Sequence, residues 1–364
     1  MTSRHLRFLA LLAVSSILAT ACTSSGDAVE TTATTSTTTV ADTTTTTLPP
    51  PTTTVPETTT STEPPLEISD SINGLPAADD LIDRRILAIK IDNHIKARPQ
   101  SALQSADAVF EIPVEGGITR FIALFHQTDL DWVGPNRSGR PTDSEVMTSF
   151  GEAPFQISGA QPWVENIFRS DGVNVVYDTG ATTFRENDRP APHNLFTSTG
   201  LIRDWADARG WSDEGPGNLF AYGEPTTPDA EATRIEVVFS QVEPPTWAWD
   251  GTKYLRFHGV TPHEWITKDG ETGQVSFDTI VIMKMRRYIK SDPSGRGSSV
   301  PTMETVGKGE AFVFYNGEVV GGTWERGSQT DKFFLATSDG VEMVLPPGRV
   351  WISFQPNNQP LVWE

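Results

Sequence analysis

The chain has 364 residues, and its 28 basic and 47 acidic side chains give a formal net charge of −19 at pH 7. Negative charge on this scale repels nucleic acid and anionic lipid, so both are excluded as bulk partners. The only cysteine is Cys22, which excludes disulfide bonds within the chain and leaves the hydrophobic core to hold any exported domain.

Residues 1–21 have the pattern of a secretory signal peptide. Arg4 and Arg7 precede an apolar run at 8–18, and small residues follow at 19–21. The run is too short for a stable membrane span. A cysteine directly after the small residues is typical of a bacterial lipobox, so we predict lipid attachment at Cys22. The alternative is an ordinary secreted protein that keeps a cysteine beside its cleavage site.

The predicted location follows from Cys22. Acylation there attaches the chain to the bilayer at the outer face of the cell membrane, and the two or more acyl chains of a bacterial lipoprotein hold it stably. Residues 22–70 are predicted to be a disordered stalk rich in Thr and Pro, because almost nothing in them can be buried. At ~3 Å per residue the stalk spans on the order of 100 Å, which brings the body within reach of the cell wall.

The first half of the body, residues 71–215, predicts an α/β domain. Apolar or alternating sequences favour strands at 86–93, 108–112, 119–125 and 173–177. A short helix or turn is expected at 103–108, and helices are expected at 144–150, 164–169 and 201–209. Thr199 is the predicted N-cap of the last helix, and Gly210 lies just past its end.

The second half, residues 230–358, predicts a β-rich domain, which makes the fold class α+β overall. Strands are expected at 235–239, 253–257, 279–283, 311–315 and 350–354. Turn signals separate them, at Asp250-Gly251, Asp269-Gly270, Asn316-Gly317 and Asp339-Gly340. The stretch 213–229 is the predicted boundary. Periodicity leaves open whether these strands form their own sheet or extend the first.

Polar residues gather next to Gly and Pro in the first half, where sheet scaffolds usually display binding groups. The four stretches are 92–100, 111–120, 134–140 and 189–195. The glycines Gly116 and Gly117 leave room for a ligand or another backbone to approach closely.

These stretches resemble the YerB-like lipoprotein family in both its N- and C-terminal parts. The resemblance rests on the blocks Ile91–His94, Arg98–Gln100, Val114–Arg120, Gly134-Pro135, Arg137-Ser138, Arg140 and Pro192–Leu195, and on Trp249-Asp250, Tyr254, Arg256, Gly259, His263, Gly322–Trp324, Gly348 and Trp351-Ile352 in the second half. It covers about residues 75–356 and implies an exported, two-part lipoprotein. Because the family has no known function, the resemblance supplies no reaction.

The favoured hypothesis is noncatalytic binding of a cell-envelope ligand, an anionic glycan or a cell-wall peptide. Four arginines lie in Gly- and Pro-rich stretches of an acidic chain, and a fold that gathers them forms a pocket for carboxylate or phosphate groups. The predicted ligand-binding residues are Asp92, His94, Arg98, Glu115, Arg120, Arg137, Arg140, His193 and Asn194. The alternative is that the arginines form structural ion pairs with Asp92, Asp107, Glu111 and Glu115.

Two other functions stay open. An envelope hydrolase or metal-dependent enzyme would use Glu111 and Glu115 as an acid–base pair, with His94 and His193 as ligands or proton carriers. Against it, the chain lacks a Gly-x-Ser-x-Gly elbow and a His-Glu-x-x-His helix. We therefore expect no catalytic residues, no metal and no cofactor. A scaffold that binds another exported protein is the remaining alternative.

Overall fold

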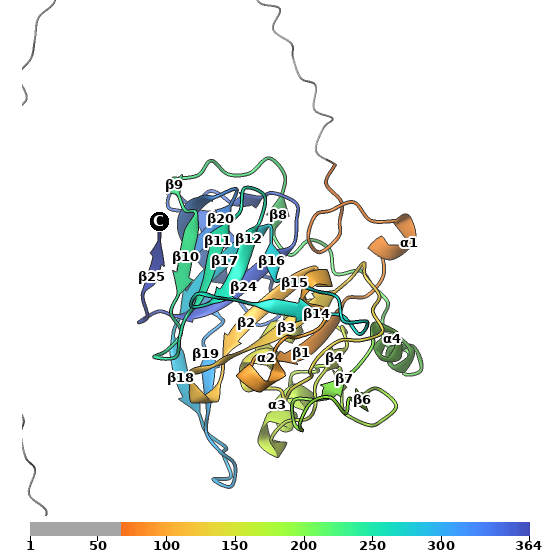
Figure 1. Cartoon of the computed structure of the whole chain (residues 1–364). Coiled ribbons are helices and arrows are strands. Elements are labelled where there is room, and N and C mark those ends of the chain that lie inside the picture. The colour runs from red at the N-terminus through yellow and green to blue at the C-terminus, as the bar shows by residue number, and fades with distance from the viewer. Residues whose placement is uncertain (1–66) are drawn as a thin grey trace, which may run out of the picture. The chain divides into compact units, whose positions relative to one another are not determined.

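A central mixed sheet runs through both halves of the described chain, residues 67–364 of a computed structural model (Figure 1). Its strand order is β22-β21-β20-β17-β24-β2-β3-β1-β4-β5, with β9 paired to β21. The predicted signal peptide, the lipid site Cys22 and the stalk up to residue 66 lie outside the described residues. None of the helices within 67–364 is both long enough and apolar enough to cross a membrane.

The first half supplies short strands and all four α-helices of the described chain. Its strands are β1 (Leu87–Asp92), β2 (Ala108–Pro113), β3 (Thr119–Phe125), β4 (Phe155–Gln156), β5 (Val175–Val176), β6 (Phe184–Arg185) and β7 (Leu195–Phe196). The α-helices are α1 (Asp79–Ile82), α2 (Pro141–Met147), α3 (Pro162–Ser170) and α4 (Thr199–Asp207). Single 3-10 turns are η1 (Ile95–Ala97), η2 (Leu103–Ser105), η3 (Glu115–Gly117) and η4 (Thr148–Phe150).

The rest of the described chain contributes strands. They are β8 (Ala221–Tyr222), β9 (Ala230–Glu231), β10 (Arg234–Val237), β11 (Pro245–Trp249), β12 (Tyr254–His258), β13 (Thr261–Pro262), β14 (Glu264–Ile266), β15 (Thr272–Gln274), β16 (Ser276–Phe277), β17 (Thr279–Met285), β18 (Arg287–Lys290), β19 (Val300–Met303), β20 (Gly307–Tyr315), β21 (Glu318–Arg326), β22 (Phe334–Thr337), β23 (Val344–Leu345), β24 (Val350–Pro356) and β25 (Leu361–Trp363). A second sheet has the order β13-β12-β11-β10-β25, with β16 paired to β12.

Strand β24 joins the two halves of the body. It pairs in parallel with β17 on one side and with β2 on the other. Ile352 therefore lies opposite Val281 of β17 and Phe110 of β2. The predicted strands of the second half are divided between two sheets. Strands β17, β20 and β24 extend the sheet of the first half, while β10–β13 form a second sheet.

Alternating side chains of the central sheet fill two cores. Ala88 and Ile352 face one core, which also takes Val146 of α2 and Phe168 of α3. Neighbouring residues such as Ile89 and Trp351 face the other core, whose far wall is the second sheet. This is the expected consequence of the two-residue period of a strand. The central sheet is consequently buried on both faces.

The α+β fold class is confirmed, and the principal predicted strands are present at β1, β2, β3, β10, β12, β17, β20 and β24. Two details of the prediction are wrong. Helix α2 begins at Pro141 rather than at 144, because Pro is favoured in the first turn of a helix. The N-cap of α4 is Ser198, whose hydroxyl accepts from the Leu201 amide, while Thr199 bonds instead to Leu130.

The shared strand predicts that the two halves unfold together. Ile352→Ala removes a fully buried side chain and is expected to lower the free energy of unfolding by about 3 kcal/mol. Native-state hydrogen exchange measures the loss, which should appear equally in the amides of β2 and β17. Ile289→Ala, at a position 58% exposed on β18, is the control and should change stability by less than about 0.5 kcal/mol. A loss confined to one half would contradict the prediction.

Candidate functional site

Three adjacent strands bring the predicted site residues to one end of the central sheet, where β1 and β2 finish and β3 begins. Asp92, at the end of β1, lies opposite Arg120 near the start of β3. Arg120 also lies opposite Ile112 near the end of β2. The segment carrying Arg137 runs alongside, since its amide donates to the Lys90 carbonyl at 2.8 Å.

Asp92 is the centre of the first group of polar contacts, and it is almost fully buried. Its Oδ2 lies 2.8 Å from His193 Nδ1 and 3.3 Å from Arg137 Nε. Its Oδ1 accepts from the His94 amide at 3.0 Å. The rings of His94 and His193 stack with centroids 4.7 Å apart. Burial, together with the neighbouring His193, lowers the pKa of His94.

Four cations lie within or next to this group, and we call Lys90, Arg120, Arg137 and Arg140 the basic cluster. Lys90 Nζ lies 2.6 Å from Asp143, and both side chains are fully buried. Arg140 Nε contacts both carboxylate oxygens of Glu115, at 2.9 and 3.0 Å. Burial lowers the pKa of Lys90 to about 8, with Asp143 opposing the shift.

Arg120 differs from the other three members of the basic cluster. It is only 7% exposed, yet within residues 67–364 no carboxylate lies within 4.0 Å of it. Its Nη1 donates to the Ser138 carbonyl at 2.8 Å, and its buried Nε has no hydrogen-bond partner among the described residues. Burial and then the positive charge of Arg140 lower the pKa of Arg120 to about 10.

A second network is built on Glu111 of β2, which is fully buried. Arg256 Nη2 and the Thr119 hydroxyl both donate to Oε1, each at 2.7 Å. Trp351 Nε1 donates to Oε2 at 2.9 Å, and the Ser353 hydroxyl lies 3.4 Å from the same oxygen. The guanidinium of Arg256 lies over the rings of three aromatic residues, Phe121, Trp247 and Trp351, at 4.9–5.6 Å.

Two histidines extend the Glu111 network. Because a guanidinium only donates, Arg256 Nη1 must donate to His263 Nδ1, 2.6 Å away, and to His258 Nε2 at 3.3 Å. The proton of His263 is then on Nε2, which donates to Gln100 Oε1 at 2.8 Å. Burial, reinforced by the charge of Arg256, lowers the pKa of both histidines. Both rings are therefore neutral at pH 7.

Arg98 lies next to the Glu111 network and is not a member of the basic cluster. Its Nε donates to Asn93 Oδ1 at 3.2 Å, and its Nη2 donates to the Asn93 carbonyl at 3.0 Å. It lines a narrow slot of about 30 Å³ together with Glu111, Arg256 and His258, which is room for about one water molecule. Burial and the charge of Arg256 lower the pKa of Arg98 to about 10.

The structure thus brings together most of the predicted site residues. Asp92, His94, Arg137 and His193 form one group, and Arg120, Arg140 and Glu115 lie next to it. Asn194 stands apart: its amide donates to the Glu186 carbonyl, and its oxygen accepts from Arg185.

The structural ion pairs considered as the alternative to ligand binding are present only in part. Of the ion pairs considered for the four arginines, Arg137–Asp92 and Arg140–Glu115 are present. Glu111 pairs instead with Arg256, and Asp107 accepts from Asn73 and from the His126 amide.

Several members of these networks were not among the predicted site residues: Lys90, Asp143, Arg256, His258 and His263. The sequence signal for Lys90 is its position inside the apolar run 86–91, because a lysine buried there needs an anionic partner. Arg256 alternates within an apolar strand and offered a similar signal. Within residues 67–364, no three His, Cys, Asp or Glu side chains are grouped so as to hold a metal ion.

The neutral histidines predict that stability falls in mild acid. A histidine whose pKa is lowered by folding contributes stability above its unfolded pKa, about 6.5, and that stability is lost as the pH falls below it. His263→Gln should therefore reduce the dependence of unfolding free energy on pH, between pH 6 and 5, by about 1.4 kcal/mol per pH unit. Urea unfolding at each pH measures this. Gln100→Ala breaks the same hydrogen bond and should lower stability while leaving the slope intact; an unchanged slope in His263→Gln would refute the prediction.

Comparisons with known proteins agree with this fold. Residues 72–212 match the family model "Protein of unknown function (DUF3048) N-terminal domain", and residues 235–352 match its C-terminal counterpart. The chain is 30% identical over 297 residues to "Putative lipoprotein YerB" of Bacillus subtilis (strain 168), covering 79% of this chain and 86% of that protein. The crystal structure of YerB from Bacillus subtilis superimposes with a TM-score of 0.70 at 24% identity, covering 82% of this chain and 99% of that one. The chain belongs to the YerB-like lipoprotein family, whose two halves are domains of unknown function.

Proposed function

We propose that this chain is a lipid-anchored exported protein that binds an anionic ligand of the cell envelope without changing it chemically. Acylated Cys22 anchors it to the outer face of the cell membrane, and the stalk carries the body toward the cell wall. The ligand group is a carboxylate or phosphate, as cell-wall peptides and anionic glycans present. It binds at the basic cluster beside Asp92 and the two stacked histidines.

The observation that carries this proposal is the unpaired guanidinium of Arg120. A buried charge without a counterion costs several kcal/mol unless other groups compensate. Arg120 has one hydrogen bond to a carbonyl and an orphaned Nε among the described residues. A ligand anion would supply the missing charge and hydrogen bonds, in the bidentate geometry that arginine favours.

The charge balance of the surroundings supports the same ligand. The four cations of the basic cluster face three carboxylates, Asp92, Asp143 and Glu115, so one positive charge is left over. The edge of the cluster is reachable from solvent, since the Arg137 side chain is 23% exposed and the Glu115 side chain 38%. An incoming carboxylate can therefore compete for Arg137 and Arg140 while it contacts Arg120.

The geometry favours binding over catalysis by the two glutamates. Both oxygens of Glu111 are held by donors in the core, whereas Glu115 is held by Arg140. The two carboxylates thus have separate partners and separate environments. Neither is placed to exchange protons with the other across a shared substrate.

One observation keeps a hydrolase as the second candidate. Asp92 orients His193 through Nδ1 at 2.8 Å, which is how a carboxylate holds a general base. Incubating the purified chain with cell-wall sacculi and analysing the soluble fragments by chromatography tests this. Release of fragments that disappears in His193→Gln would support hydrolysis, and the absence of fragments would leave binding as the function.

Binding at the basic cluster predicts opposite effects of one substitution on stability and on affinity. Arg120→Gln removes a buried charge that has no carboxylate partner, so the free energy of unfolding should stay equal or rise. Binding of the full chain to purified sacculi, measured by co-sedimentation at low salt, should weaken at least about tenfold, because a charge-assisted hydrogen bond is lost. Added salt should weaken the wild type in the same direction.

Arg203→Gln is the matched control. Arg203, on α4, is also largely buried, but its Nε pairs with Asp129 Oδ1 at 3.0 Å. Its substitution should lower stability and leave sacculus binding unchanged. Wild-type protein that fails to sediment with sacculi at low salt, or an Arg120→Gln variant that binds as well as the wild type, would reject the proposed function.

A further inference from the structure

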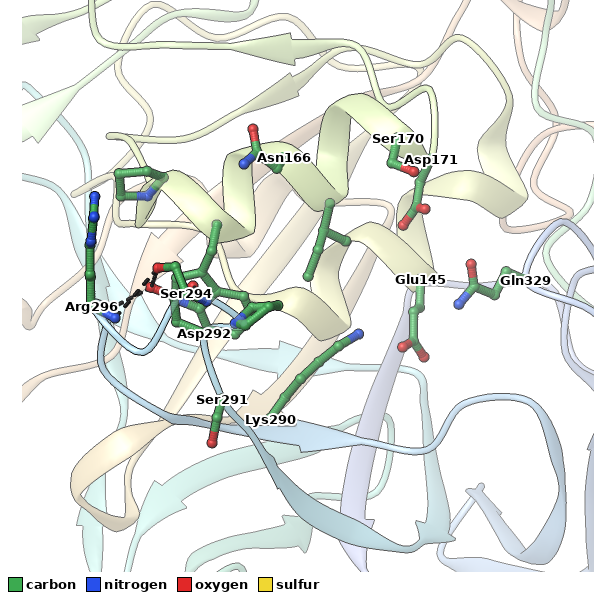
Figure 2. Close-up of a pocket in the computed structure, with 15 residues that line it drawn as sticks. Glu145, Asn166, Ser170, Asp171, Lys290, Ser291, Asp292, Ser294, Arg296 and Gln329 are labelled. Atoms are coloured by element: carbon green, nitrogen blue, oxygen red, sulfur yellow. Dashed lines mark hydrogen bonds between the residues drawn. The ribbon is translucent and has the colours of Figure 1, made fainter.

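A second cavity, lined by no member of the basic cluster, lies between helix α3 and the hairpin β18–β19. Its volume is about 760 Å³, which falls within the ~300–1,000 Å³ usual for small-ligand sites. Figure 2 shows its lining side chains, with α3 on one side and the segment that follows β18 on the other.

The middle of this cleft is apolar. Pro162, Trp163 and Ile167 of α3 line one wall, and Pro293 of the hairpin tip lines the other. Trp163 is largely buried, and its indole nitrogen is already bonded to Gln161. The wall therefore offers hydrocarbon surface rather than free hydrogen-bonding groups, and it suits an apolar chain.

The hairpin wall is fixed in place by hydrogen bonds to the first half of the chain. Gln161 Oε1 accepts from the Ser298 amide at 2.8 Å, and its Nε2 donates to the Ser298 carbonyl at 3.3 Å. At the base of the hairpin, the amide of Met303, the last residue of β19, donates to Thr142 Oγ1 at 3.0 Å. The cleft is therefore preformed, which reduces the entropy lost when a ligand binds.

Polar side chains gather at the two ends of the cleft, and at one end Asp171 accepts from the Ser144 hydroxyl at 2.7 Å, whereas Glu145 keeps one oxygen without a hydrogen bond among the described residues. Figure 2 shows Glu145, Lys290, Asp171 and Gln329 at that end, and Asp292, Ser294 and Arg296 at the other. Asp292 is used by its own loop, since it accepts from the Ser294 and Gly297 amides. The Glu145 end is consequently where a ligand would be recognised.

Glu145 is the strongest element of that end. It is only 7% exposed, and its Oε2 accepts from the Thr305 hydroxyl at 2.6 Å. Arg326 donates to the same hydroxyl at 3.1 Å and to the backbone carbonyl of Glu145 at 2.7 Å, so its charge lies next to Glu145 without forming an ion pair within 4.0 Å among the described residues. Among the described residues, Oε1 of Glu145 makes no hydrogen bond. Burial raises the pKa of this carboxyl, with Thr305 and Lys290 opposing the shift.

The charges at this end favour a cation. Glu145 and Asp171 supply two carboxylates, whereas Lys290 is the one cationic side chain of the cleft at this end. No ion pair within 4.0 Å joins Lys290 to either carboxylate among residues 67–364. The free Oε1 of Glu145 is a hydrogen-bond acceptor, and an ammonium group supplies both the donors it needs and the positive charge that favours the ionised carboxylate.

We propose that this cleft binds a primary ammonium group carried on an apolar chain, with the nitrogen on Glu145 and the chain along Trp163 and Ile167. The lysine-type side chain of a peptide has this chemistry. The site shares no lining residue with the basic cluster, so it stands whether or not the proposed function holds.

The test uses hexylamine as the probe, hexanoate as its oppositely charged counterpart, and the full chain. Isothermal titration at pH 7 should show saturable binding of hexylamine and none of hexanoate. Glu145→Gln should weaken hexylamine binding at least about tenfold, because a charge-assisted hydrogen bond is lost. Glu165→Gln makes the same change on α3 at a residue that does not line the cleft, and it should leave binding unchanged.

A second variant protects the test against misfolding of Glu145→Gln. Ile167→Trp fills the apolar middle of the cleft from a half-buried position on α3 and should abolish hexylamine binding while circular dichroism stays that of the wild type. Equal binding of hexanoate, unchanged affinity in Glu145→Gln, or binding that survives in Ile167→Trp would overturn the assignment, as would the absence of saturable hexylamine binding.

Discussion

The ion pair between Glu111 and Arg256 is the constraint on which the rest of the body depends. Both side chains are fully buried, and their nearest atoms are 2.7 Å apart. Taking two charges out of water is unfavourable by several kcal/mol per ion, and only excellent geometry with further hydrogen bonds offsets it. Here Thr119 and Trp351 donate hydrogen bonds to the carboxylate of Glu111. The aromatic rings of Phe121, Trp247 and Trp351 face the guanidinium of Arg256. Removing one partner would leave the other buried and unpaired, which costs about 3–5 kcal/mol.

This ion pair also helps to hold the two halves of the chain together as one folded body. Glu111 lies on β2 of the first half, Arg256 lies on β12 of the second sheet, and Trp351 comes from the shared strand β24. The bond from His263 to Gln100 adds another contact between the halves. By contrast, the partners of the basic cluster all lie between residues 90 and 193. The polar residues therefore divide by role: the Glu111 network joins the halves, and the basic cluster sits within the first half alone.

The sequence predicted the strands well and their partners poorly. Alternation and apolar runs located β1, β2, β3 and β24, because the two-residue period of a buried strand is a local property. The insertion of β24 between β17 and β2 was not readable, since the pairing joins residues more than 200 positions apart. The same limit applied to Glu111, whose partner Arg256 is 145 positions away. Asp92, Arg137 and His193 were found because polar residues beside Gly and Pro mark strand ends, although which of them touch depends on the fold.

Arg256 and Arg120, two of the buried arginines of the described chain, show why paired and unpaired charges are interpreted differently. Arg256 has a carboxylate, two histidine nitrogens and three aromatic rings, so its charge is paired within the fold even though its Nε, like that of Arg120, has no hydrogen-bond partner among the described residues. Arg120 has one carbonyl, and Asp92 and Glu115 act on it against the two cations Arg140 and Arg137 without forming an ion pair within 4.0 Å, so its charge has no direct partner among the described residues. Helix α2 links the two sites: Arg140, a member of the basic cluster, is its N-cap residue, and Glu145 lies five residues further along at one end of the cleft. At ~1.5 Å per residue these side chains are about 7.5 Å apart along the helix axis. One short buried helix thus begins in the basic cluster and carries, further along, a carboxylate with one oxygen unused among the described residues.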